Sequence, residues 1–172
     1  YDFLNRLRVI EKESKRVDFD YDAEGKRVRT RVTGLAAFPS VTEFLHDGLH
    51  VIEELDGTSV CLRRYYYGDG LDELIGYDNL GFYPGPGSYF YEQDSAGDVI
   101  AIHDNGGNVI ERYEYGAFGF PTFETAASVE KTVGKSDFGN PYLFKAMRYE
   151  SYLNPLYYVR ARFQDPNDGI FM

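Results

Sequence analysis

A short turn frame recurs along this chain and divides it into segments of hairpin length. Asp94 begins the run D-S-A-G-D-V-I, and ten residues later Asp104 begins D-N-G-G-N-V-I. Asp22 begins a third run of the same layout, D-A-E-G-K-R-V. Gly and Asn accept the positive φ that tight hairpin loops need. These frames therefore predict β-hairpins that follow one another along the chain.

The residues between the turns favour strands. The chain has 16 Tyr, 13 Phe and 18 Gly but no Trp. Aromatic side chains suit pleated strands, and Tyr suits a wall with water on one side because its ring can be buried while its hydroxyl stays hydrated. We expect one all-β unit of repeated hairpins that form a spiralling sheet.

A longer repeat supports stacked units. The run R-R-Y-Y-Y-G ends at Gly68, and E-R-Y-E-Y-G ends at Gly116, an offset of 48 residues with no gap. At this offset Arg64 matches Arg112, Tyr65 matches Tyr113 and Tyr67 matches Tyr115. Repeated strand–turn–strand units imply that neighbouring units bury a shared face.

The C-terminal third carries the remaining structural predictions. Residues 157–163 alternate, which predicts one strand with Tyr157, Val159, Ala161 and Phe163 on its dry face and Tyr158, Arg160 and Arg162 on its wet face. The run Asp165–Gly169 predicts a turn, and Ile170–Met172 a returning strand. Residues 124–133 are predicted as a short helix or a loop. Residues 81–88, rich in Pro and Gly, are expected to be irregular.

Charge, hydropathy and cysteine content exclude several classes of function. The formal net charge of −10 argues against a nucleic-acid partner, because neutralising phosphates requires clustered Lys and Arg. The sequence has no apolar run of membrane-spanning length. Cys61 is the single cysteine, so neither an internal disulfide nor a cysteine-based zinc site can form. Its apolar neighbours predict a buried, unreactive thiol.

Two other sequence patterns resemble metal-binding motifs, but each lacks a feature that the motif requires. His46 and His50 are four residues apart, a metal-binding spacing on a helix, but Asp47–Gly48 between them indicates a turn. The run Asp18, Asp20, Asp22 starts like a calcium loop, yet Ala23 stands where the loop needs Gly. We therefore predict no catalytic, cofactor-binding or metal-binding residues and no cofactor.

Several motifs together resemble the RHS/YD-repeat family and its repeat-associated core domain. Y-D-F-L-N-R-L (1–7) resembles the repeat consensus Y-D-x-x-G-R-L, with Asn5 in the Gly position; residues 19–28 resemble a second copy, and F-L-H-D-G (44–48) resembles Y-x-Y-D-G. Residues 94–119 resemble the core's D-x-x-G…D-x-x-G…Y-x-Y-x-x-F-G. Residues 140–166 resemble the terminal motif, with Ala146 for Gly, Ser151 for Asp and Asn154–Pro155 for the usual turn Gly.

The resemblance implies a hollow shell of β-hairpins. In the family such shells enclose a variable C-terminal toxin, animal members act in adhesion, and several bacterial members release the toxin by aspartate-dependent self-cleavage. The chain is expected to comprise YD repeats (1–35), hairpin repeats (36–118), a loop or short helix (119–139) and the terminal core motif (140–172). Its ends, at Tyr1 and Met172, are expected to continue into a longer protein.

The expected function is a structural, non-enzymatic shell segment. Its partners would be the rest of the same shell and an enclosed C-terminal effector, and the protein would be secreted or at the cell surface. One alternative is a surface-adhesion or glycan-binding wall with solvent-facing Tyr65, Tyr67, Tyr113 and Tyr115, although these rings could instead stack between strands. A second is an aspartyl autoprotease, for which Asp165 supplies at most half a site. Because open sheet edges invite pairing, the isolated chain is expected to need an assembly for stability.

Overall fold

An antiparallel sheet of eleven strands forms most of the molecule, and each strand pairs with the next one along the chain. The computed structural model describes residues 1–35, 39–81, 85–160 and 162–172. A second sheet of three strands follows. The strands of the large sheet are β1 (Val9–Lys12), β2 (Lys15–Tyr21), β3 (Arg27–Thr33), β4 (Val41–Asp47), β5 (His50–Asp56), β6 (Cys61–Tyr67), β7 (Leu74–Asn79), β8 (Gly87–Gln93), β9 (Val99–His103), β10 (Val109–Tyr115) and β11 (Pro121–Thr125).

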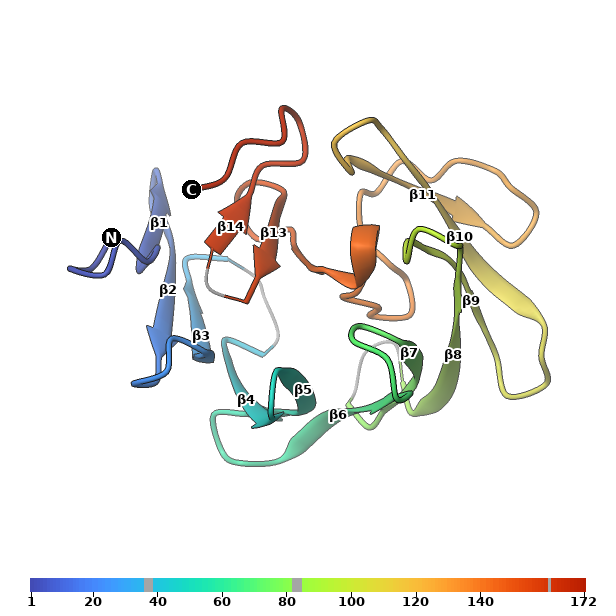
Figure 1. Cartoon of the computed structure of the whole chain (residues 1–172), viewed down its shortest axis with the longest axis horizontal. Helices are drawn as coiled ribbons and strands as arrows, with labels where there is room; N and C mark the ends of the chain where they lie inside the picture. The colour runs from blue at the N-terminus through green and yellow to red at the C-terminus, as the bar shows by residue number, and fades with distance from the viewer. Residues whose placement is uncertain (36–38, 82–84, 161) are drawn as a thin grey trace.

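The large sheet curves, and the C-terminal segment lies in its hollow (Figure 1). This segment contains the 3-10 turn η1 (Phe144–Ala146) and the strands β12 (Arg148–Glu150), β13 (Leu156–Val159) and β14 (Arg162–Gln164). The large sheet is not closed, because β1 and β11 remain its two edges. The predicted all-β class and the hairpin architecture are thereby confirmed.

One turn geometry, started by an aspartate, joins many of the strands. In the frame from Asp94, carboxylate Oδ1 accepts hydrogen bonds from the backbone N–H groups of Ala96 and Asp98 at 2.8 and 2.9 Å, and Gly97 has φ +85°. The same pattern starts at Asp2, Asp22, Asp56 and Asp104. In the first of these frames Asn5 takes the Gly position with φ +59°, which Asn tolerates better than most residues.

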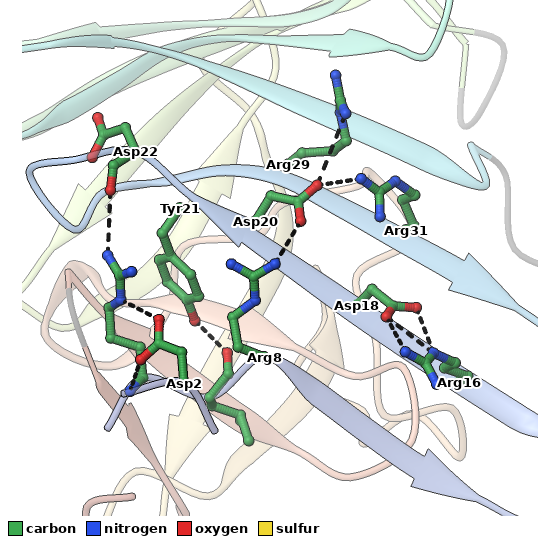
Figure 2. A network of polar contacts seen from close by, with 11 residues as sticks. Asp2, Arg8, Arg16, Asp18, Asp20, Tyr21, Asp22, Arg29 and Arg31 are labelled. Carbon is green, nitrogen blue, oxygen red and sulfur yellow. Dashed lines mark hydrogen bonds and ion pairs between the residues drawn. The ribbon is translucent and has the colours of Figure 1, made fainter. Parts of the chain in front are cut away.

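The two faces of the large sheet differ in chemistry. On the inner face aromatic rings line up across strands: Tyr65 and Tyr77 have ring centroids 6.0 Å apart, and Tyr77 and Tyr89 5.1 Å. On the outer face of β1–β3, Asp20 lies among three arginines, and Asp18 pairs with Arg16 (Figure 2). Alternation along each strand separates these two sets of residues.

Two hydrophobic clusters divide the interior. The larger one joins the inner face of β6–β11 to the C-terminal segment through Tyr65, Tyr77, Leu143 and Tyr157. The smaller one joins β2 and β3 to the end of the chain through Val17, Phe19, Leu156 and Phe163. The C-terminal segment therefore contributes to both cores, which places residues 140–172 inside the wall.

The predicted strand over residues 157–163 is wrong. The chain forms a hairpin there: β13 pairs antiparallel with β14, with Tyr158 opposite Phe163 and Val159 opposite Arg162. Of the expected wet face, Tyr158 is buried, like Tyr157, whereas Arg160 and Arg162 are exposed. Arg160 has φ +54°, and the predicted placement of Ala161 lies outside the described residues. The turn from Asp165 and the return of Phe171 beside Gln164 are confirmed.

The helix predicted over residues 124–133 is also wrong, and the loop alternative holds. Thr125 ends β11, Ser128 donates its backbone N–H to the Thr125 carbonyl at 3.0 Å, and Glu124 bridges Glu130. The irregular stretch expected over residues 81–88 is too long, since Gly87 and Ser88 begin β8; residues 82–84 lie outside the described part.

Candidate functional site

A chain of buried charges connects the C-terminal segment to the middle of the large sheet. Arg148 on β12 donates through Nη1 to Glu54 Oε1 on β5 at 2.6 Å and through Nε to Glu150 Oε1 at 3.0 Å. Glu150 also accepts from Arg27 on β3. These side chains are almost fully buried, with Arg148 7% and Glu54 1% exposed. The network spans the boundary between the two hydrophobic clusters.

An aromatic ring and a third arginine complete this network. The guanidinium carbons of Arg27 and Arg148 each lie 4.8 Å from the centre of the Phe44 ring. Arg63 donates to Glu54 Oε2 at 2.8 Å. Burial alone would raise the pKa of Glu54, but Arg148 and Arg63 outweigh that effect and lower the pKa to about 2. Glu54 is therefore a charged, fully engaged anchor, and this arrangement is suited to holding the segment in place.

A second buried carboxylate anchors the loop after β11. Glu111 on β10 accepts hydrogen bonds from Lys131 Nζ at 2.6 Å, Ser136 Oγ at 2.5 Å and the backbone N–H of Asp137 at 2.9 Å. The Tyr113 hydroxyl donates to the same carboxylate at 2.6 Å. Strand alternation could have identified Glu111, since it lies in phase with inward-facing Tyr113. Nothing local in the sequence indicated its distant partners.

The 48-residue repeat seen in the sequence also appears in the hydrogen bonds of the structure. Tyr67 on β6 donates its hydroxyl proton to the Val51 carbonyl, and Tyr115 on β10 does the same to the Val99 carbonyl. Tyr65 and Tyr113 are each 3% exposed. The glycan platform predicted from these four tyrosines is therefore wrong as to its residues: two are buried, and the other two are half-buried and bonded to backbone.

Asp165 occupies a turn. Its Oδ1 accepts from the backbone N–H of Asn167 at 2.8 Å, and its carbonyl accepts from Gly169 at 2.9 Å, where φ is +74°. Its backbone N–H donates to the Ile170 carbonyl at 2.9 Å. These contacts give Asp165 a structural role here. Its part in self-cleavage stays a prediction.

The remaining candidates are two histidines of the β4–β5 hairpin and three aspartates of β2 and the turn after it. His46 lies on β4, while the His50 ring stacks on Tyr67 with centroids 4.3 Å apart. Asp18 and Asp20 face the arginines of the outer surface, and Asp22 holds a turn (Figure 2). Within the described ranges, no three His, Cys, Asp or Glu residues are grouped so that they could hold a metal ion.

Cys61 is half-buried at the start of β6, and its Sγ lies 3.4 Å from the Arg63 carbonyl oxygen. Burial raises the pKa of its thiol, so the unreactive protonated form prevails at neutral pH. In the part of the chain that the structure describes, no helix is long and apolar enough to cross a membrane.

The curved hairpin sheet with an internal C-terminal segment has the fold of RHS-like shells. Two solved structures show the same fold over 99% of this chain: the TcdB2–TccC3 crystal structure, with a TM-score of 0.70 and 13% identity over 9% of that chain, and TcdB2–TccC3 without its hypervariable C-terminal region, with a TM-score of 0.65 and 11% identity over 8% of that chain. No family model matches the sequence.

Among curated proteins the chain is similar to WapA nucleases of Bacillus. It is 33% identical to the tRNA3(Ser)-specific nuclease WapA of Bacillus spizizenii and 30% identical to the tRNA nuclease WapA of Bacillus subtilis strain 168, over 156 residues in each case. The aligned part is 90% of this chain but only 6% of either relative. The chain thus resembles a small portion of these long proteins.

Proposed function

We propose that this chain is the closing wall segment of a shell that encloses a C-terminal effector in a longer, WapA-like protein. The observation that carries the proposal is the buried network from Glu54 to Arg148, which fixes residues 140–172 inside the curve of the sheet. A segment fixed in this way blocks the inner face at one end of the wall. The RHS-like fold and the WapA similarity support the same reading.

The chain itself contributes structure and not chemistry in this proposal. Its two most engaged carboxylates, Glu54 and Glu111, are both occupied by cationic partners. A toxic activity would belong to the enclosed effector, and the names of the relatives suggest a nuclease acting on tRNA. We further propose that the protein acts outside the cell that makes it.

Protease protection of the effector tests this proposal. In the full-length protein, the region that follows this segment should resist a protease under native conditions. Arg148→Ala should remove that protection, because it leaves Glu54 buried without its main partner and loosens the segment. Arg64→Ala, which breaks the exposed pair of Arg64 with Glu53 on the outer face, is the matched control and should keep the effector protected. Equal protease sensitivity of the effector in the wild type and in Arg148→Ala would reject the proposal.

A further inference from the structure

The chain that follows β11 turns back and covers the edge of that strand that faces away from β10. Two backbone hydrogen bonds hold it there: Thr125 donates to the Val129 carbonyl at 2.9 Å, and Lys131 donates to the Phe123 carbonyl at 2.8 Å. Residues 129–131, here called the edge segment, thus lie where a further strand would pair with β11. The opposite end of the sheet differs, since among the described residues no strand pairs with the outer side of β1.

The pairing of the edge segment with β11 is weak in itself. It consists of two backbone hydrogen bonds, and it places Glu130 directly opposite Glu124. Like charges directly opposite each other on neighbouring strands are destabilising. A short segment held only in this way would open readily. The edge segment therefore depends on a contact outside the strand pairing.

The ammonium group of Lys131 supplies that contact by reaching the buried carboxylate of Glu111 on β10. Its Nζ lies 2.6 Å from Glu111 Oε1 and 2.6 Å from Asp137 Oδ2. The Glu111 side chain is 1% exposed and the Lys131 side chain 11% exposed, so water reaches this ion pair poorly. Because a buried ion pair is costly to break from one side, Lys131 fastens the edge segment to the interior of the sheet.

We propose that the edge segment is a cap that prevents β11 from pairing with a second copy of this chain. An uncovered strand edge offers unpaired backbone groups to another chain. With β11 covered, two copies can join through β1 alone, and a pair that uses the same edge of each copy is closed. With both edges open, such pairs can join again through β11 and form long chains. The cap does not involve an enclosed effector, so this proposal and the shell proposal can fail separately.

Removing the anchor tests the cap in the whole chain. Lys131→Met keeps a long side chain but loses the ion pair, so hydrogen exchange of the backbone N–H at position 131 should become at least about tenfold faster. Sedimentation should then show species larger than a dimer that grow with concentration, whereas the wild type stops at the dimer. Faster exchange without growth beyond the dimer would overturn the proposal. Unchanged exchange would overturn it too, since Lys131 would then not hold the segment.

Two further variants control for general damage to the fold. Arg64→Met breaks an exposed ion pair with Glu53 on β6, in the middle of the sheet, and should leave both measurements as in the wild type. Growth of Arg64→Met equal to that of Lys131→Met would overturn the role of the edge segment. If Lys131→Met alone does not fold, Lys131→Met combined with Glu111→Gln takes its place, because no buried carboxylate is then left without its cation.

A substitution in the opposite direction strengthens the cap and leaves the anchor in place. Glu130→Lys replaces two like charges that face each other with an opposite pair, so exchange of the Lys131 backbone N–H should slow about threefold. This variant should also stop at the dimer. Exchange that is unchanged or faster would overturn the assignment of residues 129–131 as a segment paired with β11.

Discussion

Arg148 and Glu54 meet 2.6 Å apart in the interior, although 94 residues separate them in the chain. One lies on the short strand β12 and the other in the middle of the large sheet. Because a paired charge inside a protein becomes costly when its partner is removed, this contact makes the position of the C-terminal segment sensitive to the loss of either residue.

Breaking this pair from either side should strongly destabilise the chain. We expect Arg148→Ala to lower the free energy of unfolding by about 3–5 kcal/mol, because Glu54 keeps its charge but loses its principal partner. The double variant Glu54→Leu with Arg148→Met should lose less than Arg148→Ala alone, since the buried Glu54 carboxylate is removed together with its principal partner. Arg63 also loses its pair with Glu54 in this variant, but its side chain is 18% exposed and can reach water. Urea unfolding measures both; a larger loss in the double variant would contradict the pairing argument.

The ionisation of Glu54 should contribute to the pH dependence of the unfolding free energy. Its folded pKa of about 2 lies below the ordinary value of 4.5, so the ionised form stabilises the folded state. This contribution is fully present above pH 4.5 and is lost as the pH falls toward 2. The difference in unfolding free energy between the wild type and Glu54→Gln should therefore shrink over that window and stay constant above it. A constant difference down to pH 2 would show that Glu54 does not titrate as described.

In the turns that begin with Asp, one substitution should raise the stability of the chain and another should lower it. Ser59 occupies the positive-φ position of the turn from Asp56, at +66°, so Ser59→Gly should raise the free energy of unfolding by about 0.5 kcal/mol. Gly97 holds the equivalent position at +85°, and a Cβ there would meet nothing within 4 Å. Gly97→Ala should therefore lower stability by about 1 kcal/mol through backbone strain alone. Thermal unfolding compares the two variants, and shifts of the same sign would contradict the shared geometry.

The open edges predict association of the isolated chain. Strand β1 has a neighbour on one side only, so its outer backbone groups can pair with another chain. Sedimentation at increasing concentration should show assembly. A strictly monomeric chain that unfolds in one cooperative step would refute this prediction.

The sequence predicted local features well because turns depend on neighbouring residues. Asp94, Gly97 and their counterparts form hairpins as expected, since the carboxylate and the positive φ act within five residues. The helix over residues 124–133 failed for a related reason. The same turn forms there with Thr125 in place of Asp and Ser128, at φ +56°, in place of Gly. Neither substitution gives the signal on which the prediction relied.

The remaining wrong predictions concern features that depend on contacts between residues far apart in the sequence. Alternation in residues 157–163 indicated one strand with a wet face, and Arg160 and Arg162 are indeed exposed, so polarity could not reveal that the chain reverses near Arg160 and forms two strands. The sequence also gave no sign of the buried ion pairs around Glu54, because Glu54 contacts Arg148 only after the C-terminal segment has folded back against the sheet.

The two copies of the 48-residue unit are not interchangeable inside the wall. Arg63 on β6 corresponds to Glu111 on β10, and Glu54 on β5 corresponds to Ile102 on β9. If the C-terminal segment docked one unit too far along, Arg148 would face Ile102, which is fully buried and apolar. Arg148 would then be a buried charge without a partner, which would cost several kcal/mol of folding free energy. Matching positions of the two units therefore carry different side chains, and only one of the two registers gives Arg148 a carboxylate partner. This difference favours a single docking register for the terminal segment in a repetitive wall.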